Sequence, residues 1–249
     1  MFVCMKSFIS LLIIVFLFAG FSYGNDFRSL KTENGLTDGE ITSIVQDSTG
    51  NMWFATWSGL MKYDGYRIEL FRPQLGDSTS LPDKKIKKLF VDSKDNLWVA
   101  TSTNLCRYQK FNKSFQIYSF EEIAPNTINI LNLFESNGFL IIHAVQGLFT
   151  IPLTKTENSG FLAMHQKVMD GGEELAYYYH YTGSFSDKLL LVSNNTDGSA
   201  QIYFSRLISD GNKSHIEITS TAGLNSYIND TEYIKGRDIL FFATSRGIF

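Results

Sequence analysis

The sequence is poor in the residue types that mark several common classes of protein. Only two of its 249 residues are cysteines, Cys4 and Cys106, so it cannot carry the disulfide framework of small secreted domains. Basic and acidic residues nearly balance, at 22 and 25, which leaves no basic surface for binding nucleic acid. Beyond one apolar run near the amino terminus, no stretch is long and apolar enough to cross a membrane. We expect Cys106 to be a small buried apolar residue rather than a reactive thiol.

The apolar run near the amino terminus has the layout of a secretory signal peptide. A lysine precedes the run Phe8–Phe18, and Ser22-Tyr23-Gly24 supplies the small residues that a signal peptidase site needs. The run is shorter than the roughly 20 residues of a membrane-spanning helix. We expect residues 1–24 to form a signal-peptide helix that is cleaved before Asn25, with retention as a membrane anchor as the alternative.

The residues that usually carry catalysis are also sparse. The four histidines are scattered, without a cysteine or carboxylate at the spacing of metal ligands. The sequence contains no phosphate-binding loop, nucleophilic serine motif or glycine-rich dinucleotide turn. Residues 92–96 resemble the start of a calcium loop, but the rest of that loop is missing, which favours a plain hairpin turn. We therefore predict no catalytic residue, no metal site and no cofactor.

A repeat with a period of 45 residues is the main signal in the sequence. The segment 41–63 returns at 86–108 with turn, tryptophan, threonine and tyrosine residues in register. The repeated positions are Asp47, Gly50, Trp53, Thr56, Gly59 and Tyr63 in the first copy, Asp92, Trp98, Thr101 and Tyr108 in the second, and Thr244 and Gly247 near the carboxyl terminus. Weaker copies lie near residues 128–148 and 188–204. Chance would rarely supply so many matches in one register.

Each copy predicts four short β-strands. Over 41–56, polarity alternates within two short runs that are rich in aromatic and β-branched residues. Between the runs, the Asp47 side chain can accept hydrogen bonds from the following amides, and Gly50 tolerates a positive φ. A four-stranded unit of about 45 residues fits a β-propeller blade. Trp53 and Trp98 each carry roughly 150–250 Å² of surface, so a neighbouring blade should cover them, stabilising the fold by up to about 4–6 kcal/mol each.

These units predict an all-β fold. It would be a β-propeller of four-stranded blades, about five of which are present in an incomplete ring, preceded by the signal-peptide helix. The propeller would occupy 25–249, with blades at roughly 36–72, 81–118, 123–153, 176–207 and 223–249. Residues 27–30 look like an outer strand without a blade of its own, and the sequence stops inside a third strand. We therefore expect it to be part of a longer protein.

The repeat resembles that of a known family, the two-component regulator propeller repeat. The segments that carry the resemblance are Asn34–Asp38, Ile41–Asp47, Gly50–Thr56 and Gly59–Gly65, with a second copy at Asp92–Tyr108. The resemblance is strong from Phe27 to about Tyr118. It is weaker beyond, because the later copies lack both the aspartate and the tryptophan.

That resemblance implies the periplasmic sensor region of a hybrid two-component histidine kinase, a class that often governs polysaccharide utilisation. The implied parent is anchored in the inner membrane and carries further blades, a transmembrane helix and a kinase core downstream. The implied partners are an oligosaccharide or related small solute and those other regions of the parent, with a homodimer left open. Kinase activity would belong to the parent, so this chain is not predicted to be an enzyme.

Ligands of propellers usually bind to loops at one face. The turns between second and third strands share a face with the connections between blades, and Trp57 lies in the first of these turns. The equivalent residues in other copies are Ser102, Val145 and Ser245. The indole of Trp57 could stack on a sugar ring, and Arg246 could pair with a carboxylate or sulfate. The candidate ligand-binding residues are therefore Trp57, Arg246 and Ser102, with a packing aromatic and a solvated charge as the alternatives.

Two other functions remain open at this point. One is a scaffold, in which the propeller forms an interaction surface without a small ligand. The other is an exported glycosidase or lyase, which would need carboxylates that converge near the propeller axis. The predicted first strands 41–46 and 86–91 carry none in their interiors, which disfavours the enzyme.

Overall fold

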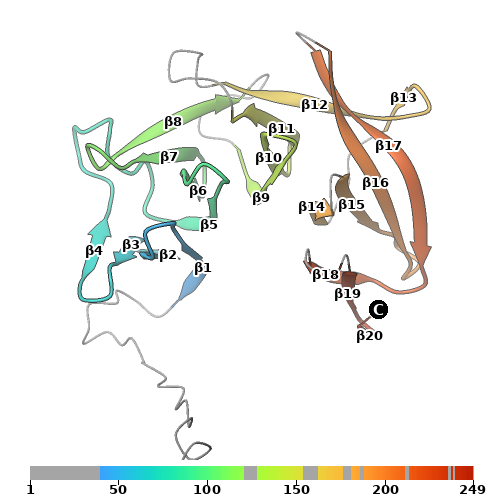
Figure 1. Cartoon of the computed structure of the whole chain (residues 1–249), viewed down its shortest axis with the longest axis horizontal. Coiled ribbons are helices and arrows are strands. Elements are labelled where there is room, and N and C mark those ends of the chain that lie inside the picture. The colour runs from blue at the N-terminus through green and yellow to red at the C-terminus, as the bar shows by residue number, and fades with distance from the viewer. Residues whose placement is uncertain are drawn as a thin grey trace, which may run out of the picture. The chain divides into compact units, whose positions relative to one another are not determined.

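A computed structural model of the chain describes residues 40–120, 128–153, 162–175, 181–185, 188–210, 213–234, 237 and 239–248. The predicted signal peptide and its cleavage site lie outside these residues. The regular structure that is described consists of twenty β-strands (Figure 1). Among the described residues there is no helix with the length and apolar character of a membrane span.

The strands form five groups, which we call blades 1 to 5. Blade 1 contains β1 (Ile41–Gln46), β2 (Met52–Thr56), β3 (Gly59–Tyr63) and β4 (Ile68–Phe71). Blade 2 contains β5 (Ile86–Val91), β6 (Leu97–Thr101), β7 (Leu105–Gln109) and β8 (Ser114–Phe120). Blade 3 contains β9 (Ile130–Ser136), β10 (Phe139–Ala144), β11 (Gly147–Pro152) and β12 (Leu162–Asp170), to whose end the short β13 (Glu173–Glu174) pairs.

The last two blades follow the same order. Blade 4 contains β14 (Tyr181–Phe185), β15 (Lys188–Asn194), β16 (Ala200–Asp210) and β17 (Lys213–Leu224). Blade 5 contains β18 (Ile228–Ile234), β19 (Ile239–Thr244) and β20 (Gly247–Ile248). Consecutive strands within each blade are antiparallel neighbours.

The first strands of the blades lie next to one another in chain order. β1 contacts β5, β5 contacts β9, β9 contacts β14, and β14 contacts β18. Side chains join them: Asn132 Nδ2 in β9 donates to the carbonyl of Thr182 in β14 at 2.7 Å. Repeated small sheets whose first strands are neighbours form a β-propeller, so the predicted fold class is confirmed.

Neighbouring blades pack through four apolar cores. Trp53 lies in the core between blades 1 and 2, and Trp98 lies in the core between blades 2 and 3. Each tryptophan is only 1% exposed. Trp53 meets the ring of Tyr108 in the following blade, and Trp98 meets the ring of Tyr118 in the outer strand of its own blade. The ring centroids of Trp53 and Tyr108 are 4.9 Å apart, and those of Trp98 and Tyr118 are 5.0 Å apart. The prediction that adjacent blades bury both indoles is therefore confirmed.

Two outer strands extend past the blade ranges expected from the repeat. β12 begins at Leu162, after the expected end of the third blade at residue 153. β17 ends at Leu224, so residues 223–224 belong to the fourth blade rather than opening the fifth. Besides pairing with β11, β12 runs parallel to β8 and to β17, which joins blades 2 to 4 into one 13-stranded sheet. Both strands lie outside the repeated motif, so periodicity could not delimit them.

Candidate functional site

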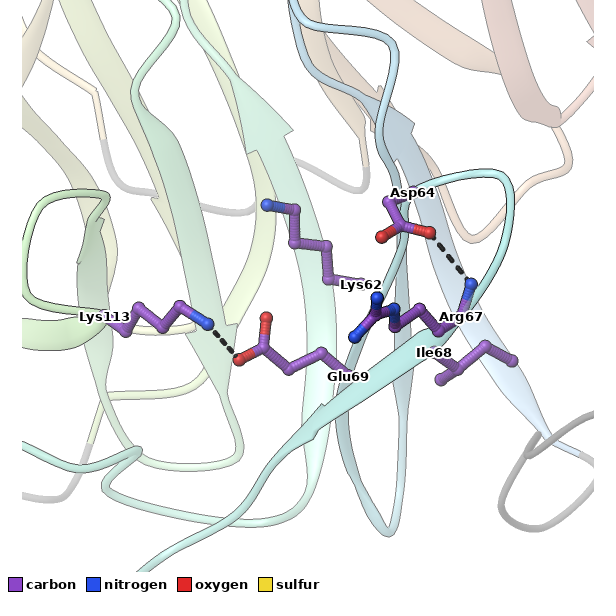
Figure 2. A pocket seen from close by; sticks show the side chains of 6 residues that line it. All are labelled: Lys62, Asp64, Arg67, Ile68, Glu69 and Lys113. Carbon is purple, nitrogen blue, oxygen red and sulfur yellow. Dashed lines mark hydrogen bonds and ion pairs between the residues drawn. The ribbon is translucent and has the colours of Figure 1, made fainter.

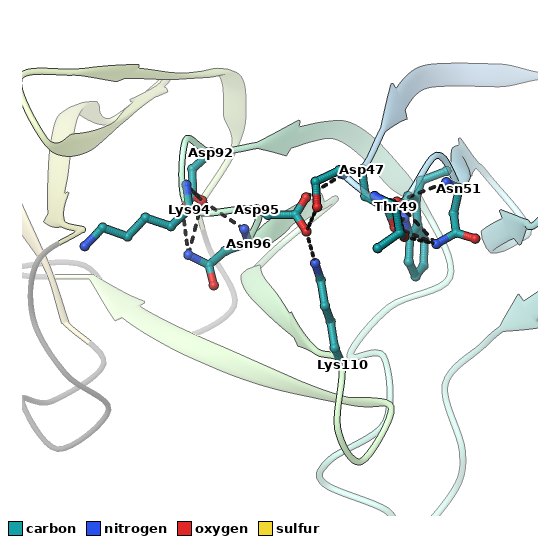
Figure 3. Close-up of polar contacts among 10 residues, drawn as sticks. Asp47, Thr49, Asn51, Asp92, Lys94, Asp95, Asn96 and Lys110 are labelled. Atoms are coloured by element: carbon teal, nitrogen blue, oxygen red, sulfur yellow. Dashed lines mark hydrogen bonds and ion pairs between the residues drawn. The ribbon is translucent and has the colours of Figure 1, made fainter.

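The aspartate of the first repeat is held inside its own hairpin turn (Figure 3). Asp47 Oδ1 accepts from the backbone amides of Thr49 and Asn51, each at 3.0 Å. Asp47 Oδ2 accepts from the indole Nε1 of Trp53 at 2.9 Å. Burial raises the pKa of Asp47, but hydrogen bonds from Thr49, Asn51 and Trp53 outweigh that effect and hold the pKa well below its usual range. A carboxylate thus orients the indole that the next blade covers.

The second repeat builds the same turn. Asp92 Oδ1 accepts from the amides of Lys94 at 3.0 Å and Asn96 at 2.9 Å, and Asp92 Oδ2 accepts from Trp98 Nε1 at 2.8 Å. The backbone closes through the Asp95 amide, which donates to the carbonyl of Asp92 at 2.9 Å. The segment that resembles a calcium loop is therefore a hairpin turn, as expected. Within the described ranges, no three histidine, cysteine or carboxylate side chains gather as they would around a metal.

A serine after each aspartate links its blade to the next. The Ser48 amide donates to Asp95 Oδ1 at 2.7 Å and its hydroxyl donates to Asp95 Oδ2 at 2.5 Å. Ser93 donates in the same way to Glu135, at 2.7 and 2.6 Å. Lys110 also pairs with Asp95 (Figure 3), and the bonds from Lys110 and Ser48 lower the pKa of Asp95. We call these serine–carboxylate contacts the interblade clasps.

The opposite ends of the strands carry the turns in which ligand binding was predicted. Thr56 Oγ1 donates to the carbonyl of Gly59 at 2.8 Å across the β2–β3 turn. Thr101 bonds the carbonyl of Asn104 at 3.2 Å, and Thr244 bonds that of Gly247 at 2.9 Å. A threonine hydroxyl that bridges the turn fixes its backbone. The backbone of the two residues between the bonded pair, 57–58, 102–103 and 245–246, is thereby held in one conformation.

The turns of blades 2, 3 and 5 are each hydrogen-bonded to the segment that precedes the first strand of the same blade. The amide of Ser102 donates to the carbonyl of Lys85 at 2.9 Å. The amide of Val145 donates to the carbonyl of Asn129 at 2.9 Å. The two kinds of loop therefore share one end of the blades, as the sequence predicted. We call this end, with the turns at 57–58, 102–103, 145–146 and 245–246, the turn face.

A β-bulge at the start of the first strand adds further residues to the turn face. The register of β1 against β2 shifts between Ile41 and Ser43, and equivalent shifts occur in β5, β9 and β18. A bulge leaves one residue outside the ladder and re-aims its side chain. The residues in this position are Thr42, Lys87, Leu131 and Asn229. Sequence reasoning missed them, although buried residues spaced by three, such as Ile86 and Leu89, break the alternation of a regular strand.

Two of the bulge residues reach to the next blade. Thr42 Oγ1 donates to the carbonyl of Ile86 at 2.8 Å. Lys87 Nζ donates to Asn129 Oδ1 at 2.6 Å. Polar groups on the turn face are thus partly engaged in holding one blade against another.

The three candidate ligand-binding residues lie on the turn face but in different blades. Trp57 is 53% exposed in blade 1. Ser102 in blade 2 is partly buried, and its hydroxyl bonds to Asp83. Arg246 in blade 5 is exposed, and its amide donates to Thr244 Oγ1 at 3.1 Å. No contact among the three is described, and their role in binding stays a prediction.

The cysteine that remains beyond the predicted leader lies in the core between two blades. Cys106 is fully buried between blades 1 and 2, and its Sγ lies 3.5 Å from the carbonyl of Val99. Burial raises the pKa of its thiol well above the usual range, which keeps the thiol protonated. Cys106 is therefore a small apolar core residue, as expected.

Comparison with known proteins identifies the repeats. The family model of the two component regulator propeller matches residues 35–58 and 80–103, the segments that contain the two aspartate–tryptophan turns. Histidine kinase P4 of Formosa agariphila is 36% identical over 55 residues, which make up 22% of this chain and 4% of the kinase. The sequence likeness is therefore confined to a small part of each protein.

Solved structures extend the likeness to most of the chain. The extracellular domain of BT3049 from B. thetaiotaomicron, described as a hybrid two component system, superimposes with a TM-score of 0.53 at 18% identity, over 89% of this chain and 34% of that chain. The extracellular domain of BT4673 from B. thetaiotaomicron, described in the same words, gives 0.51 at 18% identity, over 89% and 36%. This chain spans about a third of the length of those solved chains, and the likeness shows its fold. The chain is an all-β propeller that carries two-component regulator propeller repeats.

Proposed function

We propose that this chain is the exported sensor region of a two-component regulator and that it binds an oligosaccharide or a related solute on the turn face. The regulator propeller repeats support the first part, together with a fold like that of extracellular domains described as two component systems. In this proposal the parent is anchored in the inner membrane and contains a histidine kinase. The propeller itself recognises a ligand and performs no chemistry.

The observation that carries the ligand part is the exposure of Trp57. Its indole is 53% exposed on a turn whose backbone is fixed by Thr56. The equivalent positions hold serine in blades 2 and 5 and valine in blade 3, so the turn does not need an aromatic residue. A large amphipathic ring on a rigid frame can stack on the apolar face of a sugar ring at little entropic cost. Hydroxyl, amide and ammonium groups near the bulges would then bond the sugar hydroxyls.

Isothermal titration calorimetry of the purified chain against a panel of neutral and acidic oligosaccharides tests this function. We expect one glycan class to bind, and Trp57→Ala to weaken that binding by at least about tenfold, because about 1.4 kcal/mol of stacking would be lost. Val145→Ala is the matched control, since Val145 occupies the same turn position in blade 3 and is 63% exposed. Both variants should keep the melting temperature of the wild-type chain, because neither side chain is buried.

Two results would remove the proposal. If no glycan class released heat while the chain dimerised at micromolar concentration, the scaffold alternative would stand in its place. If Val145→Ala and Trp57→Ala weakened binding equally, the indole would not be the contact. Turnover of any glycan in the same samples would instead favour the glycosidase or lyase.

A further inference from the structure

A polar pocket of about 490 Å³ lies between the β3–β4 hairpin of blade 1 and the β7–β8 hairpin of blade 2. It is at the end of the strands opposite the turn face, because antiparallel strands place the β2–β3 and β3–β4 turns at opposite ends. Figure 2 shows its lining side chains, which come from both hairpins. They are Lys62, Asp64, Arg67, Ile68, Glu69 and Lys113.

Both carboxylates of the pocket already have partners. Asp64 Oδ1 accepts from the backbone amides of Tyr66 and Arg67, each at 2.8 Å, and so closes its own turn. Glu69 Oε1 accepts from Lys113 Nζ at 2.5 Å across the two blades (Figure 2). Hydrogen bonds from the Arg67 and Tyr66 amides lower the pKa of Asp64, so it stays charged at neutral pH. Both carboxylates therefore already have hydrogen-bond or ion-pair partners within the protein.

Two cations of the pocket, Lys62 and Arg67, form no ion pair with a carboxylate of the described residues. Lys62 Nζ lies 5.4 Å from the ring centroid of Trp53, a cation–π contact that leaves its three donors available. The guanidinium of Arg67 makes no ion pair with a described carboxylate, although the Asp64 charge acts on it through space. Three cations against two carboxylates leave the pocket with one excess positive charge. Such a site favours an oxyanion, which accepts from ammonium and guanidinium donors.

Trp53, Lys62 and Glu69 lie directly opposite one another across β2, β3 and β4. The equivalent rows of blades 2 and 3 differ in charge from that of blade 1: blade 2 has Trp98, Arg107 and Gln116, which keeps a cation but no carboxylate. The corresponding row in blade 3 is Ile141, Thr150 and Met164, which carries no charge. Because blade 3 has no charged residue in this row, a blade of this fold does not need the Lys62–Glu69 pair of charges.

Each of the two hairpins that form the pocket also carries a fully exposed aromatic ring. Tyr66 is 96% exposed and precedes Arg67, and Phe111 is 104% exposed, two residues before Lys113. The two are 45 residues apart and hold the same place in successive repeats. Neither ring lines the pocket, but each lies within two residues of a cation that does, and an aromatic ring near a cation suits a ligand that combines a charged group with the apolar face of a ring.

We propose that this pocket binds an organic oxyanion, a ring-shaped solute such as an acidic sugar that carries a sulfate or carboxylate group. Arg67 and Lys62 pair with the charged group, and Tyr66 covers one face of the ring. The site is separate from the turn face, and its existence does not depend on the role of Trp57. It lies across the joint between blades 1 and 2, so an occupant contacts both blades.

NMR or calorimetric titration of the purified chain at low ionic strength tests the site, with D-glucose 6-sulfate, D-glucuronate, D-glucose and inorganic sulfate as probes. We expect the two acidic sugars to bind, D-glucose to show no binding, and inorganic sulfate to bind at least about tenfold more weakly than the sulfated sugar, since it lacks the ring contact. Raising sodium chloride to about 0.5 M should weaken binding, since screening shortens the reach of exposed charges.

Three variants decide the outcome. Arg67→Gln should weaken the acidic sugars at least about tenfold, and Tyr66→Ala should reduce the sulfated sugar to the affinity of inorganic sulfate. Arg237→Gln removes one exposed positive charge from blade 5 and should change nothing beyond about twofold. The absence of binding by every charged probe, equal effects of Arg67→Gln and Arg237→Gln, or inorganic sulfate binding as tightly as the sulfated sugar would each overturn the proposal. Loss of acidic sugar binding in Trp57→Ala with Arg67→Gln unaffected would assign the ligand to the turn face instead.

Discussion

Replacing Asp47 by alanine removes the acceptor on which the first blade's turn and its buried tryptophan both depend. Two backbone amides and the indole N–H of Trp53 donate to this carboxylate, and the side chain is only 7% exposed. A hydrogen bond to a charged group contributes about 1.5–3 kcal/mol, and a buried donor left without a partner adds its desolvation penalty. Since water can reach the turn amides, we expect the indole to dominate, with a total loss of about 3 kcal/mol in the free energy of unfolding.

A double-mutant cycle isolates the contact between the carboxylate and the indole. Trp53→Phe keeps an aromatic ring in the core but removes the N–H, so Asp47→Ala should cost less in that background. The expected coupling is about 1.5 kcal/mol. Urea unfolding followed by circular dichroism at 222 nm or below measures each corner of the cycle, because the tryptophan signal changes with the mutation.

The effect should also depend on pH. The pKa of Asp47 is lower in the folded state than its ordinary value, so its stabilisation is fully present above that ordinary value. It is lost as the pH falls through the ordinary value towards the folded one, and the difference between the wild type and Asp47→Ala should shrink on acidification. Asp197→Ala serves as the control, since Asp197 closes an exposed turn through Ser199 and holds no buried donor. Equal losses in the two alanine variants, or a coupling near zero, would refute the role given to the buried bond.

The remaining predictions concern a turn glycine and an interblade clasp. Gly59→Ala should lower the free energy of unfolding by about 1–3 kcal/mol, because φ is 140° and a Cβ atom would lie 2.6 Å from the carbonyl oxygen of Phe71. Gly76→Ala, with a φ of 84° and nothing within 4 Å of the added Cβ, should cost less in the same thermal melts; a larger cost at Gly76 would contradict the steric explanation. Asp95→Asn should lower the melting temperature at neutral pH, since the carboxylate holds Ser48 and Lys110, and the lowered pKa means that this stabilisation disappears as the pH falls below the ordinary carboxyl value. A difference from wild type that stays constant across the acid range would count against the clasp.

The fold was readable from the sequence wherever the repeat recurs with its large residues. Trp53 and Trp98 stand 45 residues apart with the same neighbours, and the area of an indole requires cover that one small sheet does not provide. The outer strands β12 and β17 carry no motif. Their parallel pairing depends on how neighbouring blades pack, which the sequence period does not specify. Blade limits beyond the second repeat therefore depended on the structure.

The candidate sites divide in the same way. The exposure of Trp57 followed from its place in a turn, which local sequence specifies. The bond between Ser102 and Asp83 joins residues from two loops, and no spacing rule predicts it. The charged pocket needs Lys62 and Lys113, 51 positions apart, to face each other across two blades. Such pairings become visible only once the packing of the blades is known.

The passage of β12 from one blade to another has a consequence for how the propeller opens. Its residues Leu162 and Ala163 pair with β8, the next three with β11, and Lys167 to Met169 with β17. One strand thus joins blades 2, 3 and 4 in a continuous ladder of backbone hydrogen bonds. Blade 1 belongs to a separate four-stranded sheet. Amide protons along β12 should exchange with deuterium only when blades 2 to 4 come apart together, whereas those of blade 1 can exchange in a smaller and cheaper opening. Blade 5 also forms a separate sheet, so we expect the described part of the chain to open first at the joints that no strand pairing crosses, between blades 1 and 2 or between blades 4 and 5.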